Sequence, residues 1–224
     1  MKAGDRTRAG ILAWMKRRRS RRNVEGMARY GIVTPRAFGL SMAPLRRLAK
    51  EIGKDHALAA ELWTSGWLEA RILASFIDDP REVTRAQMDA WAGDFDNWAV
   101  CDTVCLHLFT RTPHAWGRAR VWSRSRREYV KRAGFTLMAC LAGHDKTARE
   151  ERFLALLPRF EAGARDERNY VKKAVSWALR RTGTRSRALR VAAIETAERL
   201  TRSERPSCRW VGRDALRDLT RRRP

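Results

Sequence analysis

Five helices predicted in this sequence open on an aromatic residue followed by a small or aliphatic one, and this recurrence constrains the fold more than any other feature. Successive members of the set lie 31, 31, 41 and 40 residues apart, with one further helix between them. Repeats of that length are typical of HEAT-type helical hairpins, which stack into a curved solenoid. The five pairs are Trp67-Leu68, Trp98-Ala99, Tyr129-Val130, Tyr170-Val171 and Trp210-Val211. The sequence therefore predicts an all-α solenoid whose second helices line a concave surface.

Helix start and stop signals support this prediction, and no segment shows the alternation expected of a strand. Ser41 has the character of an N-cap for a helix that ends at Gly53, and Asp55 caps the next helix. Thr84 and Gln87 form a capping-box pattern. The expected helices are 5–22, 41–53, 55–64, 67–77, 84–91, 96–110, 112–124, 126–142, 148–162, 166–182, 186–201 and 207–222.

The charge of the chain is its second strong constraint. Its 224 residues contain 48 Lys and Arg against 25 Asp and Glu, a formal net charge of +23. This excess predicts salt-sensitive attraction to a polyanion: nucleic acid first, with an anionic membrane surface or an acidic protein as the alternatives. No apolar run is long enough to span a membrane, and the N-terminal segment is not a signal peptide. No linker stands out, so residues 1–224 are predicted to form one HEAT-like repeat domain, including a basic N-terminal helix over residues 1–24.

The cysteines and histidines do not have the spacing of a metal site. Cys101 and Cys105 are four residues apart on one predicted helix, whereas Cys140 and Cys208 lie far away in the sequence. We therefore expect four buried, reduced thiols in a cytoplasmic protein, and no metal or cofactor.

Trp98 and Asp102 stand out because residues four apart share one face of a helix. On the predicted helix 96–110 they place a large aromatic face beside a carboxylate, a pair suited to stabilising positive charge on a substrate. The alternative is a core tryptophan beside an aspartate that complements the helix dipole. Trp177, seven residues after Tyr170, lies two turns further along the same helix face and is a candidate for a second aromatic wall.

Positions three or four residues after each opening aromatic are predicted to face the concave surface. Four of the five positions carry a cation and one carries a carboxylate: Arg71, Asp102, Arg132, Lys173 and Arg213. A basic groove with a single acid suits DNA binding combined with one chemical step. The alternative for each position is an ordinary solvated residue near a helix start.

Three segments together resemble the DNA alkylation repair enzyme family of HEAT-like-repeat alkylpurine DNA glycosylases. They are Trp98-x-x-x-Asp102, Lys131-Arg132-Ala133 and Lys172-Lys173-Ala174-Val175-Ser176-Trp177. The resemblance covers residues 27–219. It implies excision of positively charged N3- and N7-alkylated purines from DNA. The family's catalytic set is a Trp and an Asp four apart, an Arg from a later helix and a second Trp. These map by position to Trp98, Asp102, Arg132 and Trp177. Segment 17–31 is shorter than in the best-known type, and the N-terminal aromatic groove contact of that type is not placed in this chain.

The resemblance also implies roles for these residues in a monofunctional hydrolase. Asp102 stabilises an oxocarbenium-like sugar and orients water, Trp98 and Trp177 flank the sugar, and Arg132 holds the adjoining phosphate. The DNA-binding cations expected around them are Arg71, Lys131, Lys172, Lys173 and Arg213. The expected partner is double-stranded DNA containing alkylated purines, bound by a monomer associated with a bacterial nucleoid. Two other functions remain open: a non-catalytic HEAT-repeat scaffold that binds nucleic acid, and a solenoid that binds an acidic protein.

Overall fold

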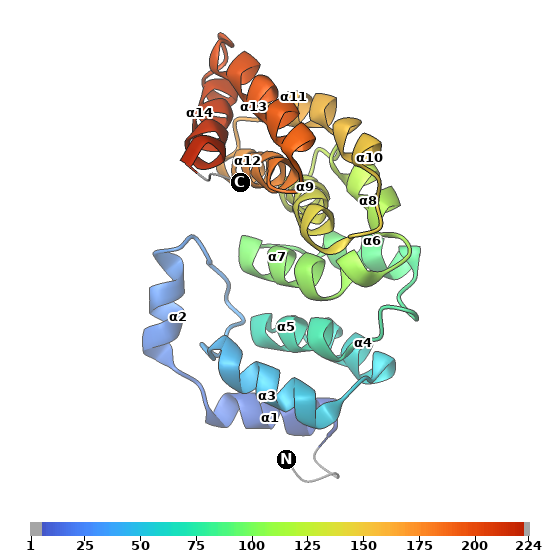
Figure 1. Ribbon diagram of the computed structural model, residues 1–224. Coiled ribbons are helices and arrows are strands. Elements are labelled where there is room, and N and C mark those ends of the chain that lie inside the picture. The colour runs from blue at the N-terminus through green and yellow to red at the C-terminus, as the bar shows by residue number, and fades with distance from the viewer. Residues whose placement is uncertain (1–5, 222–224) are drawn as a thin grey trace. The chain divides into compact units, whose positions relative to one another are not determined.

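Helices make up most of the computed structural model, which describes residues 6–221 (Figure 1). No β-strand occurs within this range, so the all-α prediction is confirmed. The chain divides into two compact units, Met1–Pro113 (unit 1) and His114–Pro224 (unit 2). Within the described residues, every helix is too short or too polar to cross a membrane.

Unit 1 is built around α5, which packs against α3, α4 and α7. Figure 1 shows α3, α5 and α7 one above another. The helices of this unit are α1 (Arg8–Arg17), α2 (Arg21–Ala28), α3 (Met42–Ile52), α4 (His56–Thr64), α5 (Leu68–Ile77), α6 (Arg85–Gly93) and α7 (Trp98–His107), followed by a 3-10 turn, η2 (Phe109–Arg111). The apolar face of α5 is fully covered, because Ala70, Leu73, Ala74 and Ile77 are all inaccessible to solvent.

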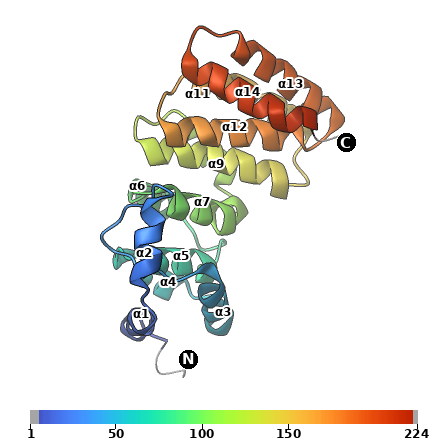
Figure 2. The same cartoon turned by 90° about the vertical axis from the view of Figure 1, so that its left-hand side faces the viewer.

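Unit 2 is built around α12, which packs against α9 on one side and α14 on the other. Figure 2 shows these three helices in successive layers. The helices of this unit are α8 (Ala115–Trp122), α9 (Glu128–His144), α10 (Glu150–Leu154), α11 (Leu157–Ala164), α12 (Asn169–Gly183), α13 (Arg187–Thr201) and α14 (Pro206–Arg221). Helix α8 pairs with α9, α11 with α12, and α13 with α14. This is the paired-helix organisation that the repeat length predicted.

The predicted caps are largely confirmed. Ser41 and Gly53 flank α3, and the Asp55 carboxylate accepts a hydrogen bond from the Leu58 N–H at 2.9 Å. The Thr84 hydroxyl accepts from the Gln87 N–H at 3.1 Å. The second half of that capping box is absent, because the Gln87 side chain donates instead to a carboxylate of another loop, described below.

Several predicted boundaries are wrong. The predicted helix 5–22 is two helices, because Ser20 interrupts it: its N–H donates to the Phe38 carbonyl at 2.8 Å and its hydroxyl caps α2. The predicted helix 148–162 is also two, since Pro158 has no N–H and its ring clashes with the carbonyl four residues earlier. The predicted helices 96–110 and 112–124 shrink to α7 and α8, with η2 between them. Positions 5 and 222, the predicted limits of the first and last helices, lie outside the described residues.

The aromatic repeat is confirmed at four of its five positions. Trp67 is the N-cap of α5, and Trp98, Tyr129 and Tyr170 are the first or second residues of their helices. The rings of Tyr129 and Tyr170 lie 5.5 Å apart between centroids, so equivalent positions of successive repeats meet. The prediction is wrong for Trp210, which is the fifth residue of α14 because that helix already starts at Pro206.

A buried carboxylate fixes the loop between α2 and α3. Glu69 of α5 is inaccessible to solvent and accepts hydrogen bonds from the N–H groups of Phe38, Gly39 and Leu40 at 2.9, 2.6 and 3.2 Å. Gly39 has φ +79°, and a Cβ there would collide with the Ser20 carbonyl oxygen. The loop therefore needs both the glycine and the carboxylate to hold this conformation.

Gly134 allows α8 and α9 to approach closely. A Cβ at this position would collide with the backbone nitrogen of Ser123 and lie 2.8 Å from the carbonyl carbon of Trp122. Both obstacles are backbone atoms, which cannot rotate away as a side chain can. Gly117, on the exposed face of α8, has open space where its Cβ would be.

We predict opposite effects of alanine at these two glycines. Gly134→Ala should destabilise the protein by about 2 kcal/mol or more, because the added methyl group overpacks the α8–α9 contact. Gly117→Ala should stabilise it by about 0.5–1 kcal/mol through helix propensity. Chemical denaturation of both variants measures the two changes, and a Gly134→Ala protein as stable as the wild type would contradict the packing argument.

Candidate functional site

Helix α7 presents Trp98 and Asp102 on its more exposed face. Asn97 starts the helix, since its side-chain oxygen accepts from the Val100 N–H at 3.0 Å. The opposite face is fully buried and carries Val100, Cys101, Val104 and Cys105. Trp98 and Asp102 are half-buried, so both have surface that a ligand can reach. Both residues thus lie four positions apart on one helix of unit 1, and their joint action on a ligand stays a prediction.

Trp98 is held by a contact that sequence reasoning missed. Its indole Nε1–H donates to the main-chain carbonyl of Tyr30 at 2.9 Å. The Tyr30 side chain is 74% exposed, and it borders a depression of about 520 Å³ that Arg22 and Arg29 also line. The sequence signal was an aromatic directly before Gly31 in a loop, a place where a large side chain has little reason to be buried.

Arg71 is braced within unit 1. Its guanidinium donates to the Asp94 carbonyl at 3.0 Å, approaches the Asp94 carboxylate to 3.6 Å and lies over the Trp63 ring. Trp63 donates to the same carboxylate at 2.8 Å and stacks on Trp91 at 4.0 Å between centroids. Asp94 thus joins α5 to the loop that leads into α7. A phosphate contact by Arg71 stays a prediction.

In unit 2, Lys131 and Arg132 of α9 both reach the start of α12. Arg132 is buried and donates to the Tyr170 carbonyl at 2.6 Å. Lys131 donates to the Asp166 carboxylate at 2.9 Å, and Arg168 pairs with the same group. Burial opposes ionisation of Asp166, but the hydrogen bonds from Arg168 and Lys131 outweigh it and hold its pKa well below the usual value.

The remaining predicted residues lie on α12 and α14. Trp177 and Lys172 are half-buried on α12, whereas Lys173 is exposed. The Lys172 ammonium lies 5.3 Å from the ring centroid of Trp210. Arg213 is exposed on α14. Unit 2 therefore brings one lysine of the predicted set to an aromatic ring of the next repeat.

The predicted set is divided between the units. Trp98, Asp102 and Arg71 belong to unit 1. The members in unit 2 are Lys131, Arg132, Lys172, Lys173, Trp177 and Arg213. Joint action of Asp102 with Arg132 and Trp177 stays a prediction.

All four cysteines are buried, as predicted, and none forms a disulfide. No three His, Cys, Asp or Glu side chains gather as metal ligands anywhere in residues 6–221.

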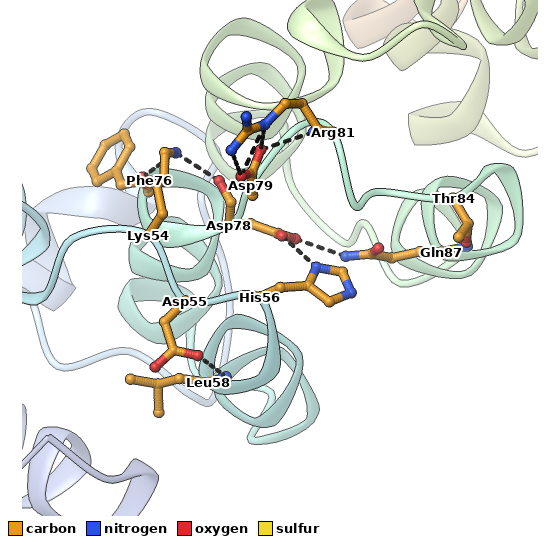
Figure 3. Close-up of polar contacts among 10 residues, drawn as sticks. All are labelled: Lys54, Asp55, His56, Leu58, Phe76, Asp78, Asp79, Arg81, Thr84 and Gln87. Carbon is orange, nitrogen blue, oxygen red and sulfur yellow. Dashed lines mark hydrogen bonds and ion pairs between the residues drawn. The ribbon is translucent and has the colours of Figure 1, made fainter.

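A second polar cluster in unit 1 surrounds Asp78 (Figure 3). Its carboxylate is inaccessible to solvent, lies 2.7 Å from His56 Nδ1 and accepts from the Gln87 amide at 2.7 Å. The Lys54 ammonium donates to the main-chain carbonyls of Phe76 and Asp78 at 3.0 and 2.6 Å. These contacts join the start of α4, the end of α5 and α6. The cluster therefore holds these helices together, and the pKa values of His56 and Asp78 within it are shifted.

Comparisons with known proteins agree with this architecture. A family described as DNA alkylation repair enzyme matches residues 11–219 of the chain. One similar solved structure is described as a new family of proteins related to the HEAT-like repeat DNA glycosylases with affinity for branched DNA structures. It aligns with a TM-score of 0.79 at 19% sequence identity, over 94% of this chain and 94% of that one. A comparison with the curated proteins gives no match.

The His56–Asp78 pair predicts a pH dependence of stability. The hydrogen bond with Asp78 raises the pKa of His56 above its ordinary value of about 6.5, although partial burial opposes this. Burial is also the main cause that raises the pKa of Asp78. A raised folded-state pKa of His56 means that this stabilisation is complete below about pH 6.5 and is lost as the pH rises through the folded value. The stability advantage of wild type over His56→Gln should therefore shrink as the pH rises above about 6.5, as urea denaturation would measure. A constant advantage would contradict this account.

Proposed function

Because this chain belongs to the DNA alkylation repair enzyme family, we propose that it hydrolyses the N-glycosidic bond of cationic N3- or N7-alkylated purines in DNA. The observation that carries the proposal is the pairing of Trp98 and Asp102 on the accessible face of α7. Both residues lie inside the matched range 11–219. The fold is that of proteins related to HEAT-like repeat DNA glycosylases.

The reaction requires stabilisation of positive charge on the sugar. Alkylation makes the purine cationic, so the C1′–N bond breaks with its electron pair leaving on a neutral base. The deoxyribose then carries oxocarbenium character, which a nearby carboxylate stabilises. We assign that role to Asp102, which also orients the attacking water and accepts its proton. Water oxygen forms the new bond to C1′, and the products are the free base and an abasic site.

Trp98 is suited to flank the sugar. The hydrogen bond to the Tyr30 carbonyl fixes the orientation of the indole ring, so the ring is already in place before substrate binds. An aromatic face stabilises a nearby cation by about 0.5–2 kcal/mol. The same role is proposed for Trp177 from its position in the family pattern. No lysine occurs on α7, which supports hydrolysis without a lyase step.

The cations are proposed to hold the DNA backbone without reading sequence. Arg132 donates to the Tyr170 carbonyl and Lys131 donates to the Asp166 carboxylate, and these contacts hold both cations at the start of α12, where we propose that they meet a phosphate. Further contacts are assigned to Arg71, Lys172, Lys173 and Arg213. The proposed ligand is double-stranded DNA containing an alkylated purine, bound by a monomer.

A second candidate function is a non-catalytic scaffold that binds DNA. It is favoured by the similar solved structure, which is described through its affinity for branched DNA rather than through an activity. The internal contacts of Arg132 and Lys131 are compatible with this role as well. The two functions predict different results when the Asp102 charge is removed: a glycosylase loses base release, whereas a scaffold has no base release to lose.

We predict that Asp102→Asn lowers the rate of base release by about 100-fold or more, because the neutral amide cannot stabilise the developing cation. The measurement is release of N7-methylguanine or 3-methyladenine from a duplex under single-turnover conditions. The matched control is Glu61→Gln, which removes the same charge from the exposed face of α4 and should keep full activity. Wild-type protein that binds the duplex but releases neither base would favour the scaffold.

A further prediction concerns the exposed Lys173 near the start of α12. Lys173→Gln should weaken duplex binding and reduce the slope of log K against log salt by about 0.9, the value for one lost phosphate contact. Lys146→Gln is the control. This exposed lysine follows the C-terminal end of α9, whereas the proposed DNA-binding residues Lys131 and Arg132 lie near its N-terminal end. Equal slopes for Lys173→Gln and wild type would exclude this contact.

A further inference from the structure

Helix α14 carries an open depression of about 580 Å³. Its lining comes from three turns of that helix: Pro206, Arg209, Trp210, Arg213, Asp214 and Arg217. The three arginines are spaced four residues apart, so they follow one another at intervals of about 6 Å along the helix axis. An aromatic ring therefore sits within a row of cations on one helix face.

Trp210 differs from the tryptophans that anchor the fold. The indole N–H groups of Trp63, Trp98 and Trp116 donate to protein acceptors at 2.8–2.9 Å. The indole of Trp210 has no such acceptor within the part of the chain that the structure describes, and the ring is half-buried. The Lys172 ammonium lies 5.3 Å from the centroid of this ring. The ring thus lies at the surface with positive charge beside it.

The charges of the depression are only partly balanced. Arg217 pairs with Asp214, and Arg209 donates to the main-chain carbonyls of Ser203 and Glu204 at 3.0 and 2.5 Å. Those carbonyls are neutral, so Arg209 keeps its full charge. Arg213 is exposed and has no ion-pair partner among residues 6–221. Three arginines against one aspartate leave an excess of two positive charges, to which Lys172 adds a third.

We propose that this face of α14 binds an unpaired segment of DNA, with Trp210 stacking on a base and Arg209 and Arg213 holding the flanking phosphates. Aromatic rings within a basic surface are the usual means of binding single strands, since every base has a face that can stack. Inside a duplex both faces of a base are covered by its neighbours, so only an unpaired base reaches the ring. The site contacts no base edge in a fixed pattern, and its binding is independent of sequence.

This site shares Arg213 and Lys172 with the duplex contacts proposed above, but binding there does not depend on hydrolysis. It lies in unit 2, needs no alkylated base and recognises a tail, gap or branch rather than a lesion. A test on undamaged DNA therefore gives an answer whether or not base release is observed, and base release from a blunt alkylated duplex is assayed independently.

The experiment compares two undamaged DNAs by fluorescence anisotropy with the full chain. One is a blunt duplex, and the other is the same duplex with a tail of about 6 unpaired thymidines. We expect wild type to favour the tailed DNA by about fivefold or more, the effect of one stacked base. Trp210→Ala should abolish this preference, whereas Trp210→Phe should keep most of it. Arg187→Gln, an exposed cation of α13, is the control and should leave the preference unchanged.

Two results would overturn the proposal: equal binding of both DNAs by wild type, or a preference that survives in Trp210→Ala. Circular dichroism of each variant checks its folding. A second measurement needs no variant, because a bromodeoxyuridine tail can be cross-linked to wild type by ultraviolet light. The cross-linked peptide should contain Trp210, and cross-links confined to other segments would refute the proposed site.

Discussion

Two aspartates, each in the loop before the second helix of a repeat, hold neighbouring repeats together. Each binds a lysine or arginine on the second helix of the repeat before it. Asp94 does this in unit 1, where it binds Arg71 of α5 four residues before Trp98. Asp166 does it in unit 2, where it binds Lys131 of α9 four residues before Tyr170. The contact fixes where the next helix starts, and hence where the aromatic residue at that start is held. A loop contact therefore sets the position of the residues proposed to meet DNA.

Internal contacts of the acidic side chains also explain how a chain with a net charge of +23 stays folded and still attracts a polyanion. Many of its acids are engaged internally: Glu69 with backbone N–H groups, Asp78 with His56 and Gln87, Asp214 with Ser176 and Arg217. Engaging the acids inside leaves cations to dominate the surface. Asp102, half-buried on α7, is a carboxylate within reach of a ligand in this setting. The role proposed for Asp102 fits that contrast, since a positive surface attracts DNA and a local negative charge would stabilise a sugar cation.

The parts of the fold that were predictable from sequence are those governed by local contacts. The caps at Asp55 and Thr84 depend on hydrogen bonds spanning three residues, and the shared face of Trp98 and Asp102 follows from helix geometry. The break at Pro158 is local and could have been predicted, whereas other features that were missed depend on distant partners. Ser20 breaks the first helix through a carbonyl 18 residues away, and the burial of Arg132 depends on a carbonyl 38 residues away. The exposed Tyr30 was missed for the same reason, because its backbone partner is Trp98.

The loop over Phe38, Gly39 and Leu40 has one more consequence. Three successive N–H groups converging on one point form a nest, a backbone concavity that binds anions such as phosphate. Here the occupant is the protein's own Glu69 side chain. A DNA-binding chain with a vacant nest would have a competing docking point for any passing phosphate, away from its working surface. Because the Glu69 carboxylate occupies this anion site, a phosphate does not bind there, and the DNA backbone is left to the cationic side chains.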